Sequence, residues 1–188
     1  MKAVMLSIQP KYCELIASGK KTVEVRRTKP KIDLPFKCYI YCTKGEPLMK
    51  TKGNDCFIDK EHRQGENLYG LYEFLNGKVI GEFVCDKVVQ FENDCYTPAF
   101  EETADLSCVG YKGLYDYLGA KEYGYGWNIT DLVIYEHPKE LSEFSSYNVS
   151  TYIDEKFGLP MPTHIIKRPF QSWGYVDVDY NLDDLLSD

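Results

Sequence analysis

The sequence lacks a hydrophobic run long enough to cross a membrane. None of its apolar stretches approaches the roughly 18 residues that a membrane-spanning helix requires. The first seven residues contain too short an apolar run for a signal peptide, and no small-residue cleavage site follows them. We therefore expect a cytoplasmic protein that has no membrane partner.

The sequence also lacks the spacings of metal and redox sites. It has seven cysteines, an odd number, and no C-x-x-C pair, so we expect reduced thiols. Cys38 and Cys42 lie on one strand face, where small buried hydrophobic side chains are expected. The three histidines, His62, His137 and His164, follow no metal-ligand spacing. We predict no metal site and no cofactor.

Internal repeats and low-complexity tracts are missing as well. A chain of 188 residues with 44% hydrophobic and 27% charged residues is typical of one globular domain with some length left for an extension. The net charge of −7 is unevenly distributed: residues 1–52 carry +8, and the remainder carries −15. This asymmetry favours a local anion-binding face over bulk binding of nucleic acid. The alternative is that the lysines only solvate one end of the fold.

Hydrophobic periodicity and turn residues predict an α+β fold with a domain boundary near residue 145. Asn76-Gly77 indicates a hairpin turn, because both central residues of such a turn need positive φ. The expected strands are 3–8, 22–27, 37–42, 71–74, 78–91 and 127–135. The expected helices are 10–19, 99–119 and 138–144, and residues 44–66 read as a long loop.

One strand of this pattern carries charges suited to a binding site. Alternation places Thr22, Glu24 and Arg26 on the same face of the strand. Lys21 begins this strand, and its ammonium group can reach the same region. An anion held by Lys21 and Arg26, with Glu24 accepting from an amino group, would form a nucleotide pocket. The alternative is a surface cluster of ion pairs that contributes little.

The spacing Gly19-x-Lys21-x-x-Glu24-x-Arg26 resembles the G-x-K-x-x-E-x-R signature of the ASCH domain family. Three further segments, 6–12, 80–83 and 125–129, resemble its lead-in, central strand and closing strand in the right order. The resemblance covers residues 1–144. It implies a PUA-like β-barrel of the ASCH type with short flanking helices, followed by a C-terminal extension, 145–188. Gln9 stands where a lysine is expected in the lead-in.

The resemblance also implies a function. Members of this family are proposed to bind RNA or nucleotides in a cleft lined by the motif. We therefore predict that RNA or a modified nucleotide is bound beside the barrel. The ligand-binding residues would be Ser7, Gly19, Lys21, Glu24, Arg26 and, as an aromatic platform for base stacking, Trp127.

Two alternatives remain open. One subgroup of the family hydrolyses acetylated cytidine with a Lys, a Thr and a Glu, and other relatives are nucleases. In an enzyme of this kind, Lys21 and Glu24 would be catalytic. Glu24, however, occupies the position of the nucleophilic Thr, so only Thr22 is left as a candidate nucleophile. The other alternative is a protein-interaction domain whose cleft has lost its ligand.

The extension contains two features of its own. Residues 167–173 read as a docking segment, which packs on the barrel or contacts a partner protein. Five aspartates fall in the last twelve residues, Asp177, Asp179, Asp183, Asp184 and Asp188. This acidic tail is expected to lie over the basic face and compete with an anionic ligand, or else to be a solvated terminus.

Overall fold

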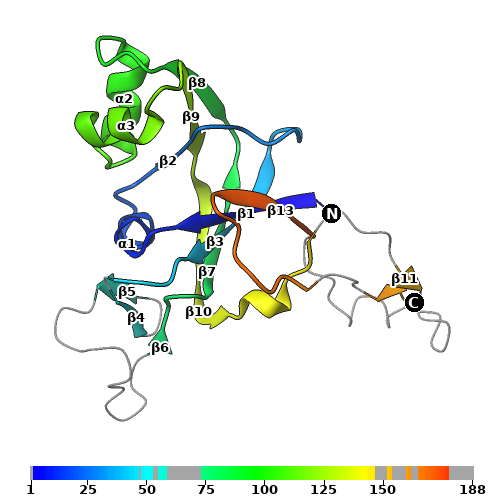
Figure 1. Cartoon of the computed structure of the whole chain (residues 1–188). Helices are drawn as coiled ribbons and strands as arrows, with labels where there is room; N and C mark the ends of the chain where they lie inside the picture. The colour runs from blue at the N-terminus through cyan, green and yellow to red at the C-terminus, as the bar shows by residue number, and fades with distance from the viewer. Residues whose placement is uncertain are drawn as a thin grey trace.

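The structure is a computed structural model that describes residues 2–46, 48–52, 55–58, 73–146, 152–153, 160–161 and 165–177. Its largest sheet has five strands in the order β10-β7-β3-β1-β13 (Figure 1). Its strands are β1 (Lys2–Ile8), β3 (Phe36–Cys42), β7 (Val79–Cys85), β10 (Thr130–Lys139) and β13 (Trp173–Asp177). The expected closed barrel is not confirmed, because the strand order of this sheet begins and ends on edge strands.

The core lies on both sides of the five-stranded sheet, with β1 near its centre. Alternate residues of β1 point to opposite faces. Val4 and Leu6 therefore pack in one cluster with Trp127, and Ala3 and Met5 pack in another. A strand buried on both faces reads as a continuous apolar run, as the sequence of β1 does.

Helix α1 (Pro10–Ala17) connects the large sheet to the motif. Pro10 occupies the first turn, where its missing N–H costs no hydrogen bond. The helix ends at Ala17, and Gly19 follows it with a φ of 71°, in the left-handed region that favours glycine. The strand predicted at 3–8 and the helix predicted from Pro10 to Gly19 are confirmed.

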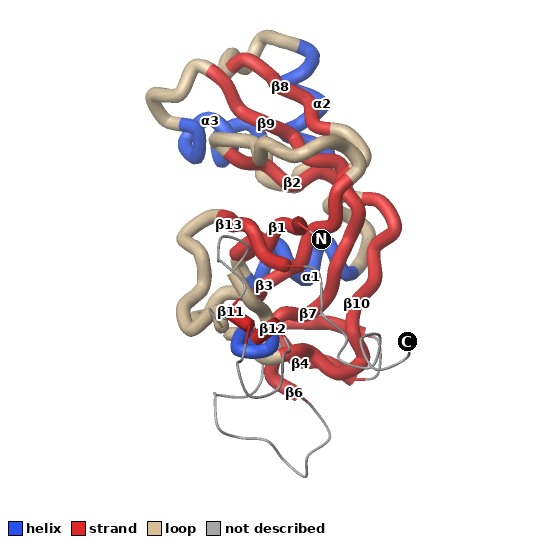
Figure 2. The backbone as a smooth tube through the Cα atoms, turned by 90° about the vertical axis from the view of Figure 1, so that its right-hand side faces the viewer, coloured by secondary structure: helices blue, strands red, loops and turns tan. Residues whose placement is uncertain are grey.

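A smaller unit consists of a three-stranded sheet and two helices. The sheet order is β2-β9-β8, with β2 (Val23–Arg26), β9 (Tyr123–Asn128) and β8 (Val88–Glu92). Helices α2 (Pro98–Leu106) and α3 (Tyr111–Leu118) pack on this sheet around Phe91, Phe100 and Leu114. Figure 2 shows this unit at one end of the molecule and the large sheet beyond it.

Several predicted elements are wrong in their extent. The helix predicted over 99–119 is two helices, because Cys108 and Gly110 adopt positive φ between them. The loop predicted over 44–66 contains strands β4 (Met49–Lys52) and β5 (Asp55–Ile58). The predicted helix at 138–144 is instead the end of β10 followed by a short 3-10 helix, Leu141–Glu143.

The predicted hairpin around Asn76-Gly77 is also wrong. Strand β6 (Glu73–Phe74) pairs with β4 rather than with the strand that follows the turn. Asn76 instead joins the start of β4 to the loop before it, since its side chain accepts from the Met49 N–H and donates to the Gly45 carbonyl. The predicted strand 78–91 is two strands, β7 in the five-stranded sheet and β8 in the three-stranded sheet. The predicted strand 127–135 is likewise divided between β9 of the three-stranded sheet and β10 of the five-stranded sheet.

The C-terminal part contributes to the main sheet. Strand β13 pairs antiparallel with β1, and Val176 is fully buried. Within the predicted docking segment, the Phe170 carbonyl accepts a hydrogen bond from the Ser7 hydroxyl, so this stretch packs against the fold. A further pair of short strands is β11 (Tyr152–Ile153) and β12 (Pro160–Met161). His62, His164 and the acidic tail beyond Asp177 lie outside the described residues.

Candidate functional site

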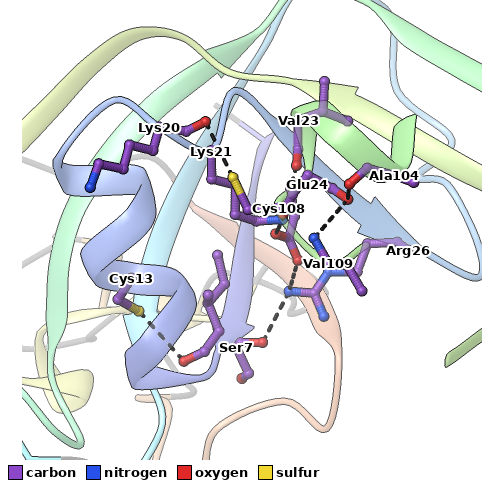
Figure 3. Close-up of polar contacts among 12 residues, drawn as sticks. Ser7, Cys13, Lys20, Lys21, Val23, Glu24, Arg26, Ala104, Cys108 and Val109 are labelled. Atoms are coloured by element: carbon purple, nitrogen blue, oxygen red, sulfur yellow. Dashed lines mark hydrogen bonds and ion pairs between the residues drawn. The ribbon is translucent and has the colours of Figure 1, made fainter. Parts of the chain in front are cut away.

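The motif lysine is buried at the start of β2. Lys21 is 2% exposed. Its Nζ donates to the carbonyls of Val23 at 2.9 Å and Ser107 at 2.8 Å, and lies 3.1 Å from Glu24 Oε2 (Figure 3). An ammonium group has three N–H donors. These three acceptors use all of them, so Lys21 ties β2 to the loop that joins α2 and α3.

Glu24 and Arg26 continue the cluster along the same face of β2. Arg26 Nη2 lies 3.0 Å from Glu24 Oε1 and donates to the Ser7 carbonyl at 3.0 Å (Figure 3). Its Nη1 is 3.4 Å from Ser172 Oγ. The Nε atom of Arg26 is buried and has no hydrogen-bond partner among the described residues. Arg26 therefore combines fixed contacts with donor capacity that the protein does not use.

The three charged side chains are thus a buried network, and not the exposed ion pairs of the alternative interpretation. Glu24 and Arg26 are each 6% exposed. Burying charges is costly unless they are paired, and here one carboxylate bridges two cations. The sequence predicted which residues meet but did not predict their depth.

A cleft of about 920 Å³ opens over this network. Its walls come from the start of α1, the end of β1, strand β2 and helix α3. The lining residues with polar side chains include Ser7, Gln9, Lys11, Tyr12, Lys21, Glu24, Arg26, Arg27, Thr28, Thr43, Asp116, Tyr117, Gln171 and Ser172. Four of these are cations and two are carboxylates, so the cleft has an excess of positive charge.

Two tyrosines in the cleft each have a cation beside the ring. Lys11 Nζ lies 4.6 Å from the ring centroid of Tyr12, and the guanidinium carbon of Arg27 lies 5.0 Å from that of Tyr117. Arg27 also donates through Nε to the Tyr117 carbonyl at 2.7 Å. Lys11 and Arg27 are exposed. Such pairs offer a ring face and a positive charge to the same ligand.

Sequence reasoning missed this second group of lining residues. Arg27 directly follows the motif, and Lys11-Tyr12 follows the helix-starting proline, so both positions carried a usable signal. Tyr117 carried none, because only the packing of α3 beside the cleft brings it there.

The prediction of Trp127 as an exposed stacking platform is wrong. Its ring is fully buried, 5.6 Å from the ring of Phe36 and 5.9 Å from that of Trp173 between centroids. Register places Trp127 directly across from Glu24, so the two side chains lie next to each other on the same face of the sheet. A strand that begins after a glycine turn predicts an exposed residue at its start, but residues of the large sheet cover Trp127.

Of three other predicted site residues, one lines the cleft and two do not. Ser7 lines the cleft, and its carbonyl accepts from Arg26. Gly19 does not line the cleft and serves instead to end α1. Thr22 does not line it either, and its backbone N–H and carbonyl bond to Leu106 and Ile129.

The cysteines in the core are not poised as nucleophiles. Burial and the neighbouring Cys85 thiol raise the pKa of Cys38 well above its usual value. Burial likewise raises the pKa of Cys85 to about 12. Both thiols are therefore protonated at neutral pH. Within the part of the chain that the structure describes, no three metal-binding side chains gather into a site.

The family model described as the ASCH domain matches residues 6–119, which is more than half of the chain. The chain belongs to the ASCH domain family. The matched residues include the whole G-x-K-x-x-E-x-R segment and most of the cleft lining. Strands β9 and β13, which pair with β2 and β1, lie beyond the matched ASCH residues.

Solved ASCH structures share this fold. The crystal structure of ASCH from Zymomonas mobilis is similar with a TM-score of 0.56 at 18% identity, covering 98% of this chain and 92% of that one. A tyrosine-to-phenylalanine mutant of that protein has a TM-score of 0.52 at 20% identity, covering 75% and 77%. At such identities the likeness concerns the fold alone. None of the curated proteins matches this chain. No helix within the described ranges is long and apolar enough to cross a membrane.

Proposed function

We propose that this ASCH domain binds RNA or a modified nucleotide in the cleft between α1 and α3. The observation that carries the proposal is the pairing of exposed cations with tyrosine rings, Lys11 with Tyr12 and Arg27 with Tyr117, on the walls of one cleft. Nucleotides combine a phosphate with a flat base, and both features have a counterpart here. Recognition of single-stranded RNA by ring stacking and charge works in the same way.

The buried network supplies the polar floor of the proposed site. Lys21 has no free donor, so its part is to hold Glu24 in place. Glu24 keeps unused lone pairs that can accept from a base amino group. The buried Nε of Arg26 has no hydrogen-bond partner among the described residues and is a further donor below the cleft. In this proposal Lys11 and Arg27 attract the phosphate, while Arg26 and Glu24 read the rest of the ligand.

Hydrolysis remains the alternative for the same cleft. Thr22, the candidate nucleophile next to the motif, is not among the lining residues. Both carboxylate oxygens of Glu24 already pair with cations, which disfavours proton abstraction by this group. These two observations favour binding without hydrolysis of acetylated cytidine.

The test is binding of a labelled single-stranded RNA, with a panel of plain and modified nucleosides scored by thermal shift. We expect Arg27→Ala and Lys11→Ala to weaken RNA binding. Each lost phosphate contact should lower the slope of log affinity against log salt by about 0.7. Lys20→Ala is the matched control, because Lys20 is an exposed lysine of the same basic region outside the cleft lining.

Two results would contradict this function. One is an unaltered protein that binds neither RNA nor any nucleoside of the panel. The other is an Arg27→Ala variant that keeps the affinity and salt slope of the Lys20→Ala control, since the ligand would then bind elsewhere.

A further inference from the structure

Exposed large hydrophobic side chains concentrate in the segment that contains helices α2 and α3, and none of them lines the cleft. Of eight such residues among those described, five lie between residues 96 and 123. They are Tyr96, Leu106, Tyr111, Tyr115 and Tyr123, with Tyr96 92% exposed and Tyr115 54% exposed. Single exposed apolar residues need no explanation, but a group of them on one surface indicates an interaction site.

Helix α3 separates this surface from the cleft. Tyr111 and Tyr115 are four residues apart, so they project from the same side of the helix. Gly113 and Tyr117 lie on a different side and line the cleft. Helices α2 and α3 stand out from the large sheet in both views of the backbone, and no described element covers their outer side (Figures 1 and 2). The two surfaces can therefore be occupied independently.

Charge determines which partner this surface suits. Residues 92–123 contain seven Asp and Glu against two Lys, in contrast to the basic first 52 residues. Glu101 and Asp105 are exposed and one helical turn apart on α2. The rings of Phe100 on α2 and Tyr111 on α3 lie 6.1 Å apart between centroids, which brings Tyr111 beside this helix. A hydrogen bond to Glu101, together with loss of hydration and the charges of Glu101 and Asp105, raises the pKa of Tyr111 to about 12. A ring and two carboxylates are thus held side by side.

We propose that the surface formed by Tyr96, Glu101, Asp105, Tyr111 and Tyr115, here called the acidic tyrosine face, docks a Lys- and Arg-rich segment of a partner protein. A cation lying on a tyrosine ring gains the attraction of the ring face and of a neighbouring carboxylate together. Tyrosine also supplies large contact area at low entropic cost, which is why it is enriched at protein interfaces. A nucleic acid is repelled by the same charges.

The experiment uses the full chain and a fluorescein-labelled peptide of alternating arginine and serine, with an alternating glutamate and serine peptide as the reference. We expect binding of the arginine peptide only. The double variant E101Q/D105N should weaken it about fivefold, since two exposed charge contacts are lost. Tyr115→Ala should weaken it by a similar factor with an unchanged salt slope, because the ring carries no charge.

The matched control is the double variant D131N/E136Q. Asp131 and Glu136 are exposed on β10, and their replacement removes the same charge from another surface. Equal weakening by both double variants would overturn the proposal, because the peptide would then respond only to net charge. Failure of the arginine peptide to bind would overturn it as well. RNA binding by E101Q/D105N that matches the unaltered protein would confirm that this face and the cleft are separate.

Discussion

Lys21 offers the sharpest test of how the ASCH motif works in this chain. Replacing it by methionine keeps most of the side-chain volume but removes the ammonium group. The Val23 and Ser107 carbonyls then lose their donor, and Glu24 loses one of its two cations. Removing one partner of a buried ion pair costs about 3–5 kcal/mol. For a chain of this size, such a loss lowers the melting temperature by roughly 10 °C.

The assay is urea unfolding followed by circular dichroism, with Lys20→Met as the control. Lys20 is the neighbouring residue and is exposed, so its replacement should change the free energy of unfolding by less than about 0.5 kcal/mol. A double-mutant cycle with Glu24→Gln should give a coupling energy of about 0.5–3 kcal/mol, because the two groups are in contact. Equal unfolding free energies for Lys21→Met and Lys20→Met would refute the structural role of Lys21.

Three further outcomes follow from the structure. Burial raises the pKa of Glu82, but hydrogen bonds from Lys37 and Tyr135 outweigh it and hold this pKa below its usual value. The stability that Glu82 contributes is therefore present above the unfolded pKa of about 4.3 and is lost as pH falls through the folded pKa. Glu82→Gln should destabilise the protein at pH 7 and have a smaller effect at pH 3, and equal effects at both would contradict the pairing. Iodoacetamide should modify the exposed Cys95 and Cys108 in the native protein before the buried Cys38 and Cys85, as read by peptide mass spectrometry, and early labelling of Cys38 would show that the core opens. Truncation after Asp177 spares the buried Val176 of β13. If residues 178–188 screen the basic face, this truncation should strengthen binding of single-stranded RNA at low salt. An unchanged affinity and salt slope would exclude that role.

Local signals in the sequence determined the first part of the fold. An apolar run, a proline that starts a helix and a glycine that ends it predicted β1 and α1, because each of these features acts within a few residues. The same short spacing brought Glu24 and Arg26 together, since i and i+2 on a strand share a face. Lys21 precedes the strand, and its long side chain reaches Glu24. The ASCH resemblance is confirmed by the family match over residues 6–119, a range that ends before the fourth segment, 125–129.

Long-range pairing decided the rest. The motif strand pairs with β9, roughly a hundred residues later, and this partner places the buried Trp127 directly across from Glu24. Strand β13 joins β1 from near the C-terminus and places Ser172 beside Arg26. The turn at Asn76-Gly77 has a strong local preference for a hairpin, yet β6 pairs with β4. No local rule specifies these partners, because burial of the whole sheet selects them.

The site divides in the same way. The sequence determined which residue types the motif would bring to one point, because their spacing along the chain sets their direction. Only the tertiary structure decided that two carbonyls and the Glu24 carboxylate would use all three donors of Lys21, and that Arg27 and Tyr117 would line the cleft. The carbonyl of Ser107 reaches Lys21 from 86 positions away. Burial and acceptor supply are properties of the packed molecule, and they determine whether a charged residue holds the fold or remains free for a ligand.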